Sequence, residues 1–162
     1  MTKRNSNQVE IRLPSEHDMP DLLALEQECF DTEYYRPHRF NRSQFASFLR
    51  NPRAIVFVAV RHGLLLGYVA GSCGGGARRG AARIESLAVT PAMRNQGIGG
   101  LLVRRFTEEA KRRGAKRLTI EVATANTGAV RFFTNRGFDP VRRLPAYYGN
   151  RYDGLRMRRE LG

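Results

Sequence analysis

The chain has 162 residues, and its 28 Lys and Arg residues outnumber its 15 Asp and Glu residues to give a formal net charge of +13. This length is typical of one domain with a sizeable core, and its two cysteines, Cys29 and Cys73, show no metal-ligand spacing, which argues against a zinc site or a disulfide framework. The sequence has neither a signal peptide nor an apolar run of about 20 residues, so we expect a soluble, cytoplasmic protein without membrane contact. We predict a flexible polar N-terminus at residues 1–8 and a single domain at residues 9–162.

The first part of the chain is predicted to contain a strand and two helices. Residues 8–13 alternate between apolar and polar as a short strand, and residues 19–30 carry apolar side chains at helical spacing. A loop with two tyrosines follows at residues 31–40. A second helix then begins at either Asn41 or Ser43, since both residue types cap helices.

Two apolar runs at residues 54–60 and 64–70 predict an antiparallel hairpin with a glycine in its turn. The stretch at residues 71–81 is rich in Gly and Arg, so we predict an exposed connection. The next strand occupies residues 83–89.

The second half of the chain alternates helices and strands. Apolar residues recur on one helix face from Ile98 onward, and Gly114 ends that helix. The remaining predicted elements are a strand at residues 118–122, a helix at 126–136, and strands at 138–144 and 154–161.

Three glycines, Gly97, Gly99 and Gly100, open the helix that follows the strand at residues 83–89. A helix start offers about four free backbone N–H groups and the positive end of a dipole, and glycines let a diphosphate approach them closely. Arg94 adds a positive charge nearby. Residues 94–100 are therefore the candidate phosphate site.

Two other phosphate motifs fit this segment less well. A Walker loop requires Gly-Lys followed by Ser or Thr, which is absent. The dinucleotide fingerprint begins correctly, and Glu121 lies about twenty residues onward as a ribose-binding acid would. However, Leu102 stands where its third glycine belongs, and residues 90–96 make too long a turn.

The order and spacing of these residues resemble the GNAT superfamily of N-acetyltransferases, and within it the ribosomal-protein alanine N-acetyltransferases. The resemblance covers about residues 80–161. It rests on the signature Arg94-Asn95-Gln96-Gly97-Ile98-Gly99, the strands at residues 84–89 and 118–122, residues 126–129, Gly137-Phe138, Tyr147-Tyr148 and residues 154–157.

The resemblance implies an α/β (α+β) fold with a mixed, mostly antiparallel sheet of six or seven strands flanked by about four helices. It also implies acetyl-CoA as the cofactor. By position, the residues that would contact acetyl-CoA are Leu87, Ala88, Val89, Arg94, Asn95, Gln96, Gly97, Ile98, Gly99, Gly100, Asn126 and Phe133.

An amine attacks a thioester only as the neutral base, so some group must remove a proton. The resemblance implies that Glu121 is this general base, and Glu85 is a second candidate. A backbone N–H near Leu87 or Ala88 would stabilise the oxyanion.

Tyr147 and Tyr148 match residues on the acceptor side of the family's site, and Tyr34 belongs to a loop expected to contribute to it. The chain departs from the family at Phe133, because a tyrosine that protonates the departing thiolate is common there. Tyr147 or Tyr148 could replace it, with Tyr148 our catalytic candidate. Alternatively, no acid is needed, because a thiol with a pKa near 8.5 leaves readily as the thiolate.

We therefore predict transfer of an acetyl group from acetyl-CoA to a primary amine, with a protein N-terminal α-amine preferred over a lysine side chain or a small amine. The alternative is a non-enzymatic nucleic-acid-binding module built on basic clusters at residues 78–79, 111–117, 142–143 and 156–159. The +13 charge also indicates a ribosomal or acidic protein partner, or simply a solvated basic surface. Nucleic acid is not expected as the substrate, and an exposed final strand could pair with another subunit to form a homodimer.

Overall fold

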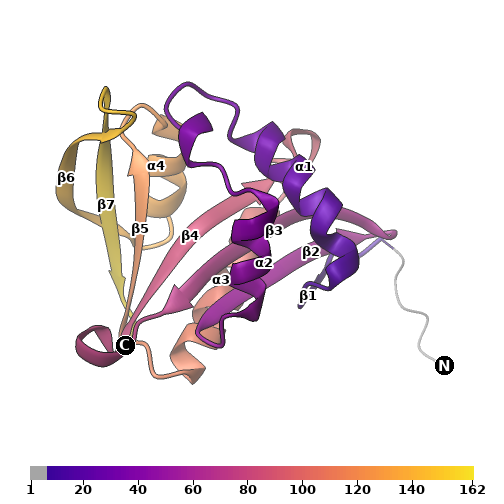
Figure 1. Cartoon of the computed structure of the whole chain (residues 1–162). Coiled ribbons are helices and arrows are strands. Elements are labelled where there is room, and N and C mark those ends of the chain that lie inside the picture. The colour runs from indigo at the N-terminus through magenta and orange to yellow at the C-terminus, as the bar shows by residue number, and fades with distance from the viewer. Residues whose placement is uncertain (1–6) are drawn as a thin grey trace.

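One seven-stranded sheet with helices on both faces forms the fold of residues 7–162, the part of the chain that this computed structural model describes (Figure 1). Most of the predicted flexible segment at residues 1–8 lies outside the described residues. The strands are β1 (Glu10–Arg12), β2 (Ala54–Arg61), β3 (Leu64–Cys73), β4 (Ala81–Val89), β5 (Arg117–Ala123), β6 (Asp139–Tyr148) and β7 (Tyr152–Glu160). The α-helices are α1 (Met19–Cys29), α2 (Arg42–Arg50), α3 (Ile98–Arg112) and α4 (Thr127–Thr134).

The strand order is β1-β2-β3-β4-β5-β7-β6, and only the central pair β4–β5 is parallel. The expectation of a mixed, mostly antiparallel sheet with about four helices is confirmed. Asn41 rather than Ser43 caps α2, because its side chain accepts a hydrogen bond from the backbone N–H of Gln44.

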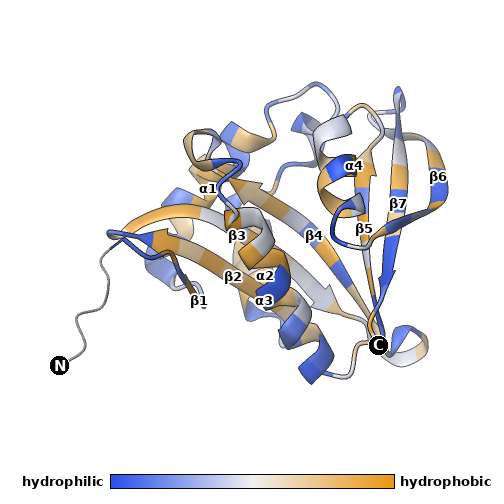
Figure 2. Ribbon diagram, turned by 180° about the vertical axis from the view of Figure 1, so that it is seen from behind, coloured by the Kyte–Doolittle hydropathy of each residue, from blue (hydrophilic) through white to orange (hydrophobic). Residues whose placement is uncertain are grey.

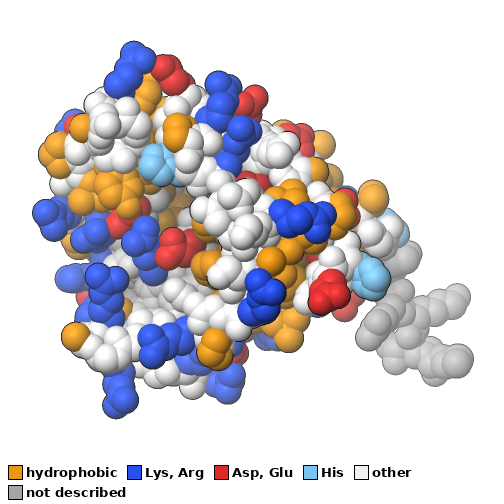
Figure 3. Space-filling view, viewed as in Figure 1, with side chains coloured by type: hydrophobic (Ala, Val, Ile, Leu, Met, Phe, Trp, Pro, Cys, Tyr) orange, Lys and Arg blue, Asp and Glu red, His pale blue; other side chains and the backbone are white. Residues whose placement is uncertain are grey.

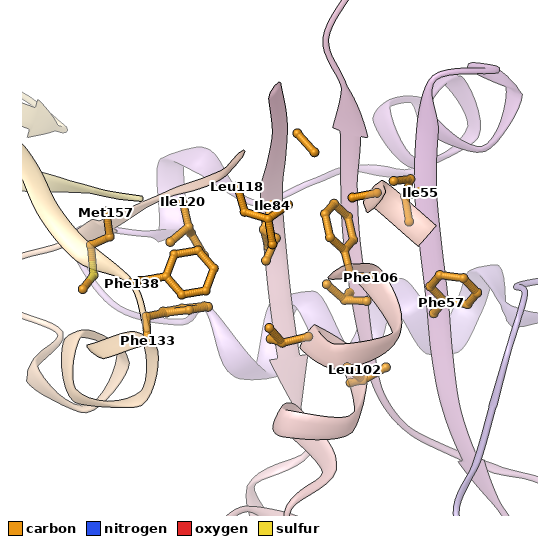
Figure 4. Packing of buried hydrophobic residues seen from close by; sticks show 14 of the residues in the cluster. Ile55, Phe57, Ile84, Leu102, Phe106, Leu118, Ile120, Phe133, Phe138 and Met157 are labelled. Carbon is orange, nitrogen blue, oxygen red and sulfur yellow. The ribbon is translucent and has the colours of Figure 1, made fainter. Parts of the chain in front are cut away.

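Hydrophobic cores lie on both faces of the sheet. The larger cluster packs α3 and α4 against the strands through residues such as Leu102, Phe106, Phe133 and Phe138 (Figure 4). The smaller cluster places α1 and α2 against β2 and β3 on the opposite face. Figure 2 shows the hydrophobic residues of β2 and β3, and more hydrophilic segments along β6 and β7.

The glycine-rich stretch at residues 71–81 is only in part the exposed connection that we predicted. β3 continues through it to Cys73, and β4 already begins at Ala81. A Cβ at Gly71 would lie 2.1 Å from the carbonyl oxygen of Arg83 and 2.6 Å from the ring of Phe106. Glycine therefore serves close packing at this position, which its composition alone does not distinguish from flexibility.

The last two strands also differ from the prediction. β6 extends to Tyr148, so the turn before β7 is shorter than residues 145–153. β7 lies between β5 and β6, and the edges of the sheet are β1 and β6. The expected exposed final strand, and the dimer contact based on it, are therefore wrong.

The central parallel strands diverge after four paired residues. Their pairing runs from Ala81–Arg117 to Ile84–Ile120 and stops there. Beyond that point β4 remains paired with β3, while β5 remains paired with β7. The strands therefore separate like the arms of a V, as Figure 1 shows, and the facing backbone edges of residues 85–89 and 121–123 have no strand neighbour within residues 7–162.

Candidate active site

A cavity of about 760 Å³ occupies the space where β4 and β5 diverge. Residues of α1 and the loop after it line one end, on the face of the sheet seen in Figure 3. Residues at the start of α3 and along α4 line the other end. Because these helices cover opposite faces of the sheet, the cavity connects the two faces through the gap between the strands.

Most of the residues selected from the sequence meet in this cavity. Gln96 and Tyr147 are the two that do not belong to its lining. The sequence-selected residues that line it are Tyr34, Glu85, Leu87, Ala88, Val89, Arg94, Asn95, Gly97, Ile98, Gly99, Gly100, Glu121, Asn126, Phe133 and Tyr148.

The start of α3 packs closely against Phe132 of α4 and against Arg136, which follows α4. Gly97, the N-cap, has φ of +83°, which favours glycine. A Cβ at Gly99 would lie 3.1 Å from the ring of Phe132, and one at Gly100 would lie 2.8 Å from the guanidinium of Arg136. The glycines therefore admit an aromatic ring and a cation beside the free N–H groups of the helix.

Arg136 was not selected from the sequence, although it lines the cavity. Its guanidinium carbon lies 3.6 Å from the ring centre of Phe132, and its Nη1 donates to the Phe132 carbonyl oxygen over 3.1 Å. Burial lowers the pKa of Arg136. Arg131 and Arg94 line the same end, and among residues 7–162 none of these three arginines forms an ion pair with a carboxylate. A helix start and three such cations together favour a bound anion.

Asn126 has a structural function beside the cavity. Its Oδ1 accepts a hydrogen bond from the backbone N–H of Ala129 and so caps α4, while its Nδ2 donates to the hydroxyl of Tyr35 over 3.1 Å. Phe133 is only 3% exposed and packs against Phe138 with ring centres 5.3 Å apart. Its ring is therefore part of the core as well as of the cavity wall.

Glu26, within the helix predicted at residues 19–30, is a buried carboxylate that lines the cavity and that was not predicted as a site residue. It is 3% exposed, accepts a hydrogen bond from the backbone N–H of Phe40 over 3.0 Å, and contacts the hydroxyls of Tyr68 and Ser86. Burial is the main cause that raises the pKa of Glu26 to about 7. The available signal was a carboxylate within the apolar row of the predicted helix at residues 19–30.

Glu121 lies in a different environment. Its side chain is 5% exposed, and its two oxygens accept hydrogen bonds from Arg83 at 3.0 Å, from Arg156 at 2.7 Å and from the hydroxyl of Tyr147. Burial acts to raise the pKa of Glu121, but the bonds from Tyr147 and Arg156 and the charge of Arg83 together lower it. Glu121 is therefore a stable carboxylate whose acceptor positions are occupied.

Aromatic rings surround the end of the cavity near α1. Tyr35 and His38 each lie edge to face with Tyr148 at 5.3 Å between ring centres, and Tyr34 packs against Tyr35. Tyr148 is 6% exposed, and burial raises its pKa, so its phenol stays protonated at neutral pH. This end could hold an amine among ring faces.

The loop at residues 31–40 and the turn before β7 meet above this aromatic end. Glu33 accepts hydrogen bonds from Arg151 over 2.7 Å and from the hydroxyl of Tyr152 over 2.6 Å. Tyr152 also packs edge to face with Tyr34. Two segments more than a hundred residues apart in sequence therefore enclose one side of the cavity.

Within residues 7–162, no helix has both the length and the apolar composition needed to cross a bilayer. The same residues contain no group of three or more His, Cys, Asp or Glu side chains arranged to hold a metal ion.

Comparison with known proteins gives a consistent family. The model of the acetyltransferase (GNAT) family matches residues 19–138. An uncharacterised N-acetyltransferase of Methanocaldococcus jannaschii is 30% identical over 135 residues, which are 80% of this chain and 60% of that protein. The chain thus spans less than two thirds of the length of this relative.

Two further similarities concern proteins with more specific names. The N-alpha-acetyltransferase MAK3 of Arabidopsis thaliana is 27% identical over 143 residues, covering 88% of this chain and 72% of that protein. The crystal structure of a ribosomal-protein-alanine N-acetyltransferase from Brucella melitensis superposes with a TM-score of 0.81 at 25% identity, over 94% of this chain and 99% of the other.

Proposed function

The chain belongs to the acetyltransferase (GNAT) family, and from this premise we propose that it transfers an acetyl group from acetyl-CoA to a protein N-terminal α-amine. The observation that carries the proposal is the cavity at the divergence of β4 and β5, which ends at the glycine-rich start of α3.

The cavity has the features that a long cofactor with a diphosphate and an amide-containing arm requires. The backbone edge of Leu87 to Val89 that faces the cavity is not paired with β5, so it offers hydrogen-bonding groups to the amides of the arm, although the Val89 carbonyl oxygen already accepts from Nε of Arg94 over 3.1 Å. Gly97 to Gly100, with Arg94 and Arg136, offer N–H groups and positive charge to the diphosphate. When bound, acetyl-CoA supplies the acetyl group as a reactive thioester.

Glu26 is the residue that we propose as the proton acceptor. Its pKa of about 7 is close to the operating pH, as general-base catalysis favours. An α-ammonium has a reference pKa of about 7.7–8.0, so proton transfer to Glu26 is uphill by about one unit, or roughly 1.4 kcal/mol. A lysine ammonium with a pKa of about 10.4 would lose its proton to Glu26 at a cost of over three units, roughly 4.6 kcal/mol. This difference favours an α-amine as the acceptor.

Glu121 is proposed to position the acceptor side of the site. Its ion pairs with Arg83 and Arg156 and its hydrogen bond with Tyr147 hold β4, β5, β7 and the end of β6 together beside the cavity. A carboxylate with a lowered pKa is a weak base, which fits this function better than proton abstraction. Tyr148, a protonated phenol in the cavity wall, is proposed to donate a proton to the leaving thiolate in place of the tyrosine that Phe133 replaces.

The names of the relatives support an N-terminal acceptor. MAK3 is named an N-alpha-acetyltransferase, and the Brucella protein is named for a ribosomal-protein alanine. Alanine has no side-chain amine, so its reactive amine is the α-amine of a chain that begins with it.

The test is a comparison of peptide acceptors with acetyl-CoA, with released CoA thiol as the readout. We expect turnover with a peptide that has a free N-terminus and no lysine. The matched control has a blocked N-terminus and one internal lysine, and we expect it to react at least about a hundredfold more slowly, given the difference in amine pKa. Equal or faster reaction of the lysine peptide would reject the α-amine, and no thiol release with any amine would reject the transferase.

A further inference from the structure

Seven cations gather at the end of the sheet where β4 and β5 are paired, opposite the end at which these strands diverge. Figure 3 shows Lys and Arg side chains over the lower left of the molecule, near the place where Figure 1 marks the C-terminus. We call this surface the basic end, and its residues are Arg53, Arg78, Arg79, Lys111, Arg112, Arg113 and Lys116.

Hydrogen bonds between distant segments fix the shape of the basic end. The backbone N–H of Cys73 donates to the carbonyl oxygen of Arg53 over 2.9 Å, and that of Lys116 donates to Gly80 over 2.6 Å. The guanidinium of Arg113 donates to the carbonyl oxygens of Pro52 and Ala54 at 3.1 and 3.0 Å. The loop between β3 and β4, the start of β2 and the end of α3 are thus joined into one surface.

The glycines of the β3–β4 loop let arginines pack against it. A Cβ at Gly75 would lie 2.3 Å from the guanidinium carbon of Arg53, and one at Gly74 would lie 2.5 Å from the carbonyl oxygen of Arg78. These glycines therefore let the guanidinium of Arg53 and the backbone of Arg78 pack closely against the loop.

Most of the charge at the basic end lacks a carboxylate partner. Glu109 pairs with Arg112 and Arg113, each at 2.7 Å, and Glu160 pairs with Arg158. Among the described residues, Arg53, Arg78, Arg79, Lys111 and Lys116 form no ion pair, and all five are exposed. Five exposed cations without an ion-pair partner in the described residues favour a partner with several negative charges.

We propose that the basic end binds the phosphate backbone of duplex nucleic acid without reading its bases. Protein partners are usually anchored by apolar or aromatic side chains, and the exposed large hydrophobic residues of the described chain lie outside this surface. Single-stranded nucleic acid is held by aromatic stacking, which these segments cannot provide because they contain no aromatic residue. Phosphate contacts, in contrast, need only cations and polar groups.

The basic end and the cavity lie at opposite ends of α3, whose 15 residues span about 22 Å. Nucleic acid at the basic end would therefore leave the cavity open. The inference does not depend on the proposed acetyl transfer, and it gives the positive charge a use outside the cofactor site.

The test is a salt titration of binding to 20-base-pair RNA and DNA duplexes, in the presence of saturating CoA so that the cavity is blocked. We expect four to six phosphate contacts, so the logarithm of the affinity should fall with the logarithm of salt concentration at a slope of about −4 to −5. Arg78→Glu with Lys116→Glu should weaken binding at least about tenfold at low salt and reduce the steepness of the slope by about 2.

The control variant is Arg42→Glu with Arg142→Glu, which lowers the net charge by the same four units, from +13 to +9. We expect it to bind the duplexes within about twofold of the wild type, because both residues lie outside the basic end. Equal weakening by the two double variants, loss of binding when CoA is added, or equally tight binding of polyglutamate would each overturn the proposal. Acetyl transfer and thermal unfolding should be unchanged in both variants, which separates this test from that of the proposed function.

Discussion

Glu26 and Glu121 line the same cavity, but their surroundings shift the pKa values of the two carboxyl groups in opposite directions. Glu26 has hydroxyl and backbone partners and no ion pair within residues 7–162, so burial controls its pKa. Glu121 is also buried, but two guanidinium groups and a phenol stabilise its charge. The sequence alone does not distinguish the pKa values of these two glutamates, because the groups that contact each carboxylate come from other elements.

Replacing Glu26 with Gln should remove the proton acceptor while retaining a polar side chain that can still accept from the N–H of Phe40. We expect kcat/KM for a free N-terminal peptide to fall about 10²- to 10⁴-fold. The rise in rate with pH through about 7 should also be replaced by one at about 7.7–8.0, where the free α-amine loses its proton. A pH–rate profile of wild type and variant checks both, and persistence of that rise in Glu26→Gln would exclude Glu26 as the base.

Replacing Glu121 with Gln should have a smaller and different effect. The amide can still accept hydrogen bonds, but it no longer compensates Arg83 and Arg156. We expect a rise in KM for the peptide and about a tenfold loss in kcat/KM, with the pH profile of the wild type retained. If the profile is lost in Glu121→Gln and kept in Glu26→Gln, the two assignments must be exchanged.

The start of α3 combines a feature that the local sequence predicts with contacts that come from another part of the chain. The glycine pattern predicted a phosphate site at this helix start, because the sterics of a helix start are local. Phe132 of α4 and Arg136 just after that helix lie beside these glycines, and no spacing rule in the sequence connects them to this segment.

Replacing Arg136 with Ala should weaken CoA binding by roughly tenfold to a hundredfold, the value of a hydrogen bond to a charged group. Pantetheine has no diphosphate, so its affinity should not change. Calorimetry with both ligands checks this, and Arg142→Ala on the edge strand β6 is the control for lost charge. Equal loss for CoA and pantetheine would show that Arg136 supports the fold rather than the phosphates.

Sequence periodicity predicted the bounds of β3 and β6 poorly, because these strands contain glycine or proline residues that ordinarily mark loops. Gly71 permits β3 and β4 to approach below the ring of Phe106, so β3 is longer than its apolar pattern. Pro145 and Ala146 lie within β6, where the pairing is irregular between Leu144 and Tyr148. Turn residues in an irregular edge strand resemble a loop in the sequence.

At the scale of the whole molecule, the buried Glu26 should make stability depend on pH. Its pKa rises from 4.5 to about 7 in the fold, so between these values the folded chain holds a proton that the unfolded chain has lost. The free energy of unfolding should therefore fall as pH rises through this window.

Compared with Glu26→Gln, the wild type should lose about 2 kcal/mol of stability between pH 5 and pH 8, given a shift of this size. Denaturant unfolding of both proteins at several pH values measures the difference. A difference in unfolding free energy that does not vary with pH would mean that Glu26 is not held protonated by the fold.

The sequence by itself determined the fold class, most helix and strand positions, the glycine-rich start of α3 that we propose as the phosphate site, and the family resemblance, because helix caps, apolar periodicity and backbone sterics act over a few residues. Only the tertiary structure decided that β7 is an inner strand, that Glu26 is the buried acid, and that Arg136 lies beside the start of α3. It also joined Arg53, the glycine-rich loop and Lys116 into one surface. These features depend on burial and on contacts between distant segments, and burial and through-space charge set pKa values and binding surfaces.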